Sequence, residues 1–283
     1  MDITTYRIPV GDWVDAAVEW MTVNLEWLFD GVATFLKALI SGLETGLLVP
    51  SALIMVVIVA ALAYVAKGWK FSLFSALSFA VMAMMGLWEA AMSTLSLVLV
   101  ASVIALIIGM PLGIAASRSD RFSRMLRPAL DLMQAMPSMV YLIPAIVFFG
   151  IGTVPGAVAT VVFALPPAVR LTELGLRQVD QEVVEAGEAF GATPFKILTR
   201  VQIPLALPTI MAGVNQVIML ALSMVVIAGM VGAGGLGAVV FRGVTRLDVG
   251  LGFEGGLSVV IMAVFLDRIT AAFGQRASRR VSH

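Results

Sequence analysis

The sequence predicts an all-α polytopic membrane protein, and three observations support that fold class. Hydrophobic residues make up 60% of the 283 residues, and the mean hydropathy is +1.02. Only 13% of the residues are charged, whereas a soluble domain carries about 25%. The apolar residues also form seven stretches, most of them near the length that crosses a hydrocarbon core of about 30 Å.

The seven stretches are expected to be helices, because backbone groups in lipid must pair within their own segment. The alternating strands of a membrane barrel are not seen. We place the spans near residues 50–66, 70–88, 93–116, 134–150, 154–172, 208–232 and 253–272.

Lysine and arginine are unevenly shared between the two sets of connections, and this bias predicts orientation. One set holds Lys67, Lys70, Arg118, Arg121, Arg124, Arg127, Arg170, Arg177, Lys196, Arg200, Arg268, Arg276, Arg279 and Arg280. The other set holds Arg7, Lys37, Arg242 and Arg246. We expect the basic set to face the cytoplasm, which puts the N-terminus outside and the C-terminus inside. The arginines of 117–133 also suit contact with anionic lipid headgroups.

The N-terminal part is expected to be peripheral to the bundle. Residues 1–49 read as a periplasmic or interfacial amphipathic segment, anchored by Trp20, Trp27, Leu28, Phe35 and Leu36. An eighth span over 21–43 is the alternative. The other predicted parts are two peripheral helices in 50–88, a core in 89–272 containing a cytoplasmic loop at 173–207, and a cytoplasmic tail at 273–283.

Composition excludes several classes of function. The chain has no cysteine, and its one histidine is His283, so disulfides, thiolate chemistry, histidine triads and Cys/His metal sites are not expected. The net charge of zero gives no argument for nucleic acid. No G-x-x-x-x-G-K-[ST] phosphate loop occurs, and glycine-rich 231–237 lacks the lysine. We therefore expect neither a catalytic residue nor ATP hydrolysis on this chain.

Residues 184–210, VEAGEAFGATPFKILTRVQIPLALPTI, interrupt the apolar pattern with charges, glycines and prolines. A short helix through Glu185–Phe190 is expected to end at Gly191, which tolerates the left-handed conformation of a C-terminal cap. Thr193 and Pro194 suit the cap and first position of a second helix. Phe195, Ile197 and Leu198 would form its apolar face, and Pro204 and Pro208 are expected to break the chain before the next span.

Ala186, Gly187, Ala189 and Gly191 are small, so another backbone can approach one side of this corner closely. Such a surface favours docking into a partner's groove. An amphipathic loop lying on the bilayer is equally compatible with the residues alone. The spacing resembles the EAA motif of ABC importer permeases, in which Glu-Ala-Ala is followed by Gly and then by Ile-x-Leu-Pro. The matching residues are Glu185, Ala186, Gly187, Gly191, Val201, Ile203 and Pro204, with Gly187, Val201 and Ile203 departing conservatively.

That resemblance implies that the corner docks on an ATP-binding subunit. It implies two ATPase subunits, which carry the ATP and magnesium, together with a second permease copy and an extracytoplasmic solute-binding protein. The coupling residues on this view are Glu185, Ala186, Gly187, Phe190, Gly191, Pro194 and Pro204.

Segments 130–152, 207–237 and 242–270 are similar to permeases for glycine betaine, proline betaine and choline. The likeness covers roughly 90–272 and implies the type I ABC importer transmembrane domain with a five-helix core, in the bacterial inner membrane. The solute expected is glycine betaine, proline betaine, choline or trimethylamine N-oxide.

Polar and soft residues of span 208–232 are candidates for a solute path between two permease copies. They are Asn215, Gln216, Met219, Ser223 and Met224, with Tyr141 from span 134–150. Alternatively, Asn215 and Gln216 only join neighbouring helices. Pro137, Pro144, Gly109, Pro111 and Gly113 suit either hinges or local kinks.

The rival class is an ion-coupled secondary carrier. Its proton-coupled form relies on carboxylates at mid-membrane. Here Glu89, Glu173 and Asp267 all lie near predicted helix ends, which argues against proton coupling and less strongly against sodium coupling.

Overall fold

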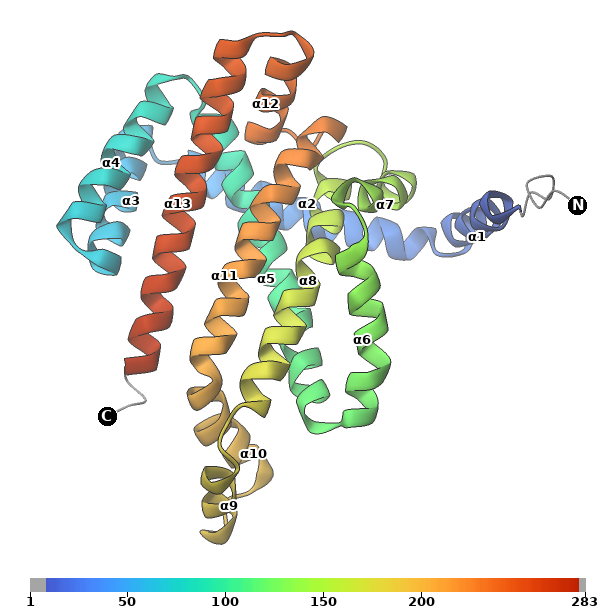
Figure 1. The fold of residues 1–283 in the computed structure, drawn as a ribbon. Coiled ribbons are helices and arrows are strands. Elements are labelled where there is room, and N and C mark those ends of the chain that lie inside the picture. The colour runs from blue at the N-terminus through green and yellow to red at the C-terminus, as the bar shows by residue number, and fades with distance from the viewer. Residues whose placement is uncertain (1–8, 280–283) are drawn as a thin grey trace, which may run out of the picture.

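The computed structural model describes residues 9–279, and every element in that range is a helix (Figure 1). Arg7, Arg280 and His283 lie outside the described residues. The elements are α1 (Val10–Asn24), α2 (Glu26–Leu48), α3 (Ala52–Lys67), α4 (Trp69–Met84), α5 (Trp88–Arg118), α6 (Asp120–Ala135), η2 (Ser138–Tyr141), α7 (Leu142–Phe149), α8 (Thr153–Arg177), α9 (Gln181–Ala189), α10 (Pro194–Ile197), η3 (Leu198–Gln202), α11 (Ile203–Ala228), η4 (Gly229–Val231), α12 (Gly235–Thr245) and α13 (Val249–Arg279).

The centre of the molecule is formed by α5, α8 and α11, with α13 packed on α11 (Figure 1). Small residues let α5 and α8 approach closely, as is common between membrane helices. A Cβ atom built on Gly109 would lie 2.4 Å from Ala168 Cβ, and one on Gly113 would lie 2.6 Å from the Val169 carbonyl oxygen. α5 continues through Pro111 as one helix. Gly109 and Gly113, on either side of this proline, therefore allow α5 to pack closely against α8.

The chain reverses between α11 and α12 through the glycine-rich stretch 231–237. Gly232, Gly234 and Gly235 all have positive φ, which glycine adopts without a side-chain clash. The Leu236 amide then donates to Thr94 Oγ1 at 2.8 Å, which fixes the start of α12 against α5. α12 and α13 form a hairpin at the end of the molecule opposite α9 (Figure 1).

The N-terminal helices lie outside the central bundle. Figure 1 shows α2 running across the bundle, with α1 extending away from it. Four of the predicted anchors are exposed: Trp20, Trp27, Leu28 and Phe35. The fifth prediction is wrong, because Leu36 is buried in the core. Phe29 of α2 stacks on Phe148 of α7 with ring centroids 4.5 Å apart, which secures α2 to the bundle.

The number of long apolar helices differs from the seven predicted spans. Within residues 9–279, five helices are long and apolar enough to cross a membrane, and six if the bent pair of α6 with η2 and α7 counts as one span. α2 is one of the five. The predicted spans 50–66 and 70–88 correspond to α3 and α4, which have 16 residues each and reach about 24 Å at 1.5 Å per residue.

The prediction that 134–150 forms one continuous membrane helix is wrong. These residues form the end of α6, the turn η2 and the eight-residue α7, and the chain bends by 108° between α6 and the segment Ser138–Phe149. Pro137 lies at the bend, where the backbone is extended. Tyr141 braces the two arms, because its hydroxyl donates to the Met133 carbonyl of α6 and its ring meets Phe163 of α8 edge-on.

Candidate coupling site

The predicted helical corner is present as α9 and α10. Asp180 caps α9 by accepting a hydrogen bond from the Glu182 amide at 3.0 Å. Gly191, with φ +76°, ends α9. The Gly191 amide donates to Glu188 O at 2.8 Å and the Ala192 amide to Gly187 O at 3.1 Å. These two hydrogen bonds form a Schellman cap. Gly191 therefore ends α9, as predicted from the sequence.

No part of residues 9–279 covers the outer surface of the corner. α9 buries none of its residues, Phe190 is 92% exposed, and Phe195 of α10 is 72% exposed. The inner side is closed, since Ile197 and Leu198 are buried. The prediction that Phe195 shares one apolar face with Ile197 and Leu198 is therefore wrong, and the two phenylalanines are the most exposed large apolar side chains of the corner, followed by Val183.

The small residues have separate roles in this corner. Gly187 faces inward, where an added Cβ would meet Ile197 Cγ1 at 3.6 Å, an ordinary van der Waals distance. Ala186 and Ala189 are exposed. Glu185 is also exposed and accepts a hydrogen bond from Gln181 on its own helix at 2.9 Å. The exposed face thus combines small residues, carboxylates and two phenylalanines.

The predicted break at Pro204 and Pro208 is wrong. α10 passes through the π turn η3 directly into α11, and the run Pro194–Val231 behaves as one long apolar helical segment. Pro204 occupies the start of α11, where a missing N–H is tolerated, and Pro208 lies inside the helix. Pro204 therefore lies in the continuous helical run that leads from the corner into α11.

Two connections tie the corner to the central bundle. Arg118, the last residue of α5, donates to the Pro194 carbonyl oxygen at 3.3 Å. Gln178, just after α8, accepts a hydrogen bond from Thr209 of α11 at 3.5 Å. The corner is therefore continuous with α11 and only three residues from the end of α8.

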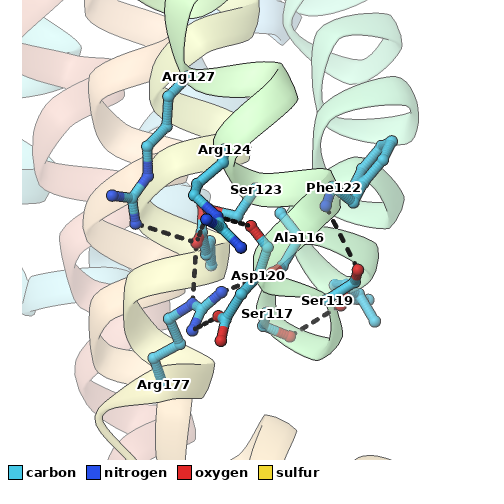
Figure 2. A network of polar contacts seen from close by, with 11 residues as sticks. Ala116, Ser117, Ser119, Asp120, Phe122, Ser123, Arg124, Arg127 and Arg177 are labelled. Carbon is cyan, nitrogen blue, oxygen red and sulfur yellow. Dashed lines mark hydrogen bonds and ion pairs between the residues drawn. The ribbon is translucent and has the colours of Figure 1, made fainter.

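A row of polar contacts joins α6 to α8 beside the corner, and we call it the polar ladder; Figure 2 shows its part around Asp120, Ser123, Arg127 and Arg177. Its members are Asp120, Ser123, Arg127 and Asp131 of α6, and Arg170, Glu173 and Arg177 of α8. The outer rung joins Arg177 Nη1 to Asp120 Oδ1 at 2.8 Å. In the next rungs, Glu173 Oε1 accepts from Ser123 at 2.7 Å and lies 3.7 Å from Arg127 Nη2. The last rung pairs Arg170 with Asp131.

Glu173 is the centre of the ladder. Among the residues whose side chains the structure describes, it is the one charged residue that is buried, with 7% of its surface exposed. Arg177 of the same helix donates to it at 2.8 Å and also donates to the Ala116 carbonyl of α5 at 2.9 Å. A buried carboxylate is tolerated because these donors replace its water.

The candidate path residues do not share one environment. Gln216 and Ser223 are exposed, and Met219 is half-buried. Asn215 instead joins α11 to α13, donating to Asp267 at 2.9 Å and accepting from Thr270 at 2.7 Å. Met224 is fully buried and Tyr141 is 6% exposed. The helix-joining alternative therefore describes Asn215, and the open strip of α11 carries Gln216, Met219 and Ser223.

A protein-family model described as "Binding-protein-dependent transport system inner membrane component" matches residues 101–282. The chain belongs to this family. It is accordingly a multi-pass permease subunit of the inner membrane, and the match contains the whole coupling corner and polar ladder.

Named relatives extend the likeness to the N-terminal helices. The glycine betaine transport system permease protein OpuAB of Bacillus subtilis (strain 168) is 48% identical over 264 residues, covering 93% of this chain and 94% of the relative. The glycine betaine/proline betaine transport system permease protein ProW of Escherichia coli (strain K12) is 45% identical, covering 96% and 77%. The trimethylamine N-oxide permease TmoV of Ruegeria pomeroyi is 44% identical, covering 76% and 32%.

The fold also resembles a solved transporter. A chain from inward-facing crystals of the MetNI methionine ABC transporter aligns with a TM-score of 0.59 and 25% identity, covering 71% of this chain and 98% of that chain. The type I importer transmembrane fold predicted from the motif is therefore confirmed.

Sequence reasoning missed the polar ladder. It assigned the arginines of 117–133 to topology and placed Glu173 at a helix end. The overlooked signal is helical spacing, since Asp120, Ser123, Arg127 and Asp131 recur every three or four residues and so share one face. Arg170, Glu173 and Arg177 repeat the same spacing with opposite signs.

Proposed function

We propose that this chain is the membrane subunit of an ATP-driven importer for small quaternary ammonium solutes. The chemical class is glycine betaine, proline betaine, choline or trimethylamine N-oxide. Support comes from relatives that align over most of this chain and carry glycine betaine or trimethylamine N-oxide in their names. Membership of a binding-protein-dependent family favours this importer over an ion-coupled carrier.

The single observation that carries the coupling proposal is the unpartnered corner. A helix that buries nothing, beside two exposed phenylalanines, is expected to dock in a groove of another subunit. We assign that groove to an ATPase subunit, which carries the ATP and magnesium. The corner then faces the cytoplasm, in agreement with the bias of lysine and arginine toward this end. Glu185, Ala186, Gly187, Phe190, Gly191 and Pro194 form or shape the docking face in this proposal.

Helical continuity explains how docking would move the membrane part. α10 continues through η3 into α11 without an intervening loop. A displacement of the corner would therefore also displace α11. α8 receives the same displacement through its short link to α9. Because α8 and α11 pack along each other, closure of two ATPase subunits would change how two permease copies meet.

The solute path is proposed between those two copies. The open strip of α11 offers Gln216 and Ser223 with the adaptable thioether of Met219. These neutral groups attract a zwitterion or cation weakly, which favours passage over retention. High affinity is then assigned to the solute-binding protein, where aromatic rings suit a methylated ammonium group.

The docking proposal is tested by site-directed crosslinking. The chain has no native cysteine, so Phe190→Cys introduces a single attachment point for a photoreactive probe. We expect this probe to crosslink to the ATPase subunit in the assembled complex. The matched control is Phe253→Cys, which replaces an exposed phenylalanine at the opposite end. Equal crosslinking from both positions, or none from Phe190→Cys, would contradict the assignment.

The solute class is tested separately with the complete complex in vesicles. Uptake of radiolabelled glycine betaine is measured with competing choline, proline betaine, trimethylamine N-oxide and methionine. We expect competition from at least one methylated amine and none from methionine. ATP-dependent accumulation of labelled methionine, with no accumulation of glycine betaine and no effect of the other methylated amines, would leave the importer assignment intact and overturn the solute class.

A further inference from the structure

The attachment of α6 to α8 differs in kind from the other packing in the bundle. α6 buries only Ser123 and Leu130 of its 16 residues, and Met125 and Leu132 remain exposed. Apolar burial therefore contributes little to holding α6 against α8. The rungs of the polar ladder supply the specific contacts that remain.

The ladder also fixes the register between the two helices. The rungs run antiparallel, from Asp120 with Arg177 at one end to Asp131 with Arg170 at the other. Charges alternate along both helices. Sliding α6 by one turn in one direction opposes Asp131 to Glu173, and sliding it in the other direction opposes Asp120 to Glu173. Like charges in contact are unfavourable, so either slip is resisted.

The position of the ladder links two other features of the fold. One end lies beside Arg177, three residues from the start of the coupling corner helix α9. At the other end of α6, the chain turns through 108° into η2 and α7. If α6 follows a movement of α8, the bend at the end of α6 moves as well. Tyr141, which joins the two sides of that bend, then moves with it.

We propose that the polar ladder makes α6 and α8 move as one body during transport, with Glu173 as the positioning residue. This inference rests on the proposed function, because the movement begins at the coupling corner. Glu173 holds three partners at once: Ser123, Arg127 and Arg177. Loss of its charge leaves both arginines without their shared carboxylate and frees α6 from α8.

The first test measures distance in the complete transporter. Spin labels are placed at Met125→Cys on α6 and Leu174→Cys on α8, both exposed positions. A reference pair joins Met125→Cys to Leu77→Cys, an exposed position on the peripheral helix α4, outside the α8–α11 pair. We expect the α6–α8 distance to stay constant between the ATP-free and ATP-bound states while the α6–α4 distance changes. A change in the α6–α8 distance, or no change in either distance, would overturn the proposal.

The second test measures solute transported per ATP hydrolysed, a ratio that a simple loss of assembled protein leaves unchanged. Glu173→Gln keeps the size of the side chain and removes its charge, and we expect a several-fold fall in the ratio. Arg121→Gln is the control, because Arg121 lies on α6 outside the ladder. An unchanged ratio in Glu173→Gln would refute the positioning role.

A charge exchange separates a broken rung from general damage. Asp131→Arg places two arginines opposite each other, and we expect the ratio of solute to ATP to fall. Adding Arg170→Asp restores opposite charges, and the ratio should recover in the double variant. Failure to recover would contradict the ladder. Failure of the wild-type complex to show ATP-dependent uptake would instead contradict the proposed function, so the two outcomes are distinguishable.

Discussion

The central bundle of this permease is closely packed, whereas the coupling corner, formed by α9 and α10, leaves most of its side chains exposed. In the bundle, glycines bring α5 and α8 so close that an added Cβ atom would overlap a neighbour. In the corner, α9 buries nothing and Phe190 lies almost fully in the open. The close packing of the bundle is made within one chain, whereas the exposed face of the corner is the surface proposed to dock on a partner. Substitutions in the bundle should therefore affect folding, and substitutions in the corner should affect assembly.

The largest effect is expected in the bundle. Gly113→Leu places a side chain against the Val169 carbonyl and Thr172, with the first added atom at 2.6 Å from that oxygen. We expect a loss of about 3 kcal/mol or more, as for severe overpacking, seen as a lower melting temperature in detergent. Gly256→Leu is the matched control, because nothing lies within 4 Å of its added Cβ. Equal melting temperatures for the two variants would contradict the packing account.

The next effect is expected at the exposed phenylalanines. Phe190→Ala should leave the melting temperature of the permease nearly unchanged, since surface substitutions usually stay within about 0.5 kcal/mol. Binding of the ATPase subunit should weaken by about 2 kcal/mol, the scale of an interface hot spot. Titration of the purified permease with the ATPase measures this loss. Phe253→Ala, at the other end of the molecule, should bind normally; a similar loss there would count against the corner.

A smaller effect is expected at the cap of α9. Gly191→Leu meets open space but must keep φ at +76°, which costs about 1–2 kcal/mol for a residue with a side chain. We expect reduced solute-stimulated ATP hydrolysis with normal membrane insertion. Gly191→Asn is the control, because asparagine tolerates this conformation better. If leucine and asparagine reduced stimulation equally, side-chain bulk rather than backbone strain would be responsible.

The smallest effect is expected inside the corner. Gly187→Ala adds a methyl group at an ordinary 3.6 Å from Ile197 Cγ1 and removes a glycine from a helix, which favours α9 by up to about 1 kcal/mol. We expect stimulated ATP hydrolysis to persist and proteolysis of the corner to slow. Faster proteolysis in the alanine variant would show that Gly187 is required for close packing.

The part of the structure that sequence could predict is the part set by local rules. Gly191 sets the end of α9 and Pro194 the start of α10 through backbone preferences that need no distant partner. Thr193 occupies the cap position of α10, but its side chain makes no cap hydrogen bond. The same local rules failed at Pro204 and Pro208. There a π turn precedes the first proline, and the helix continues through the second.

Features that depend on tertiary pairing were beyond the sequence. Hydropathy marks 134–150 as apolar but does not reveal that Pro137 turns the chain before a span is complete. The sequence leaves open whether Asn215 lines a path or joins helices, and its bonds to Asp267 and Thr270, over fifty residues away, show the helix-joining contact. The polar ladder likewise joins residues about 40 to 60 positions apart, beyond the reach of local helix rules.

The central claim is that this permease moves solute only when a partner drives its corner. The most direct measurement is uptake of labelled glycine betaine into vesicles that contain the permease alone, under sodium and proton gradients, or the permease with its ATPase subunit, binding protein and ATP. The account predicts accumulation only in the second set of vesicles, and its loss in Phe190→Ala. Gradient-driven accumulation by the permease alone would contradict it.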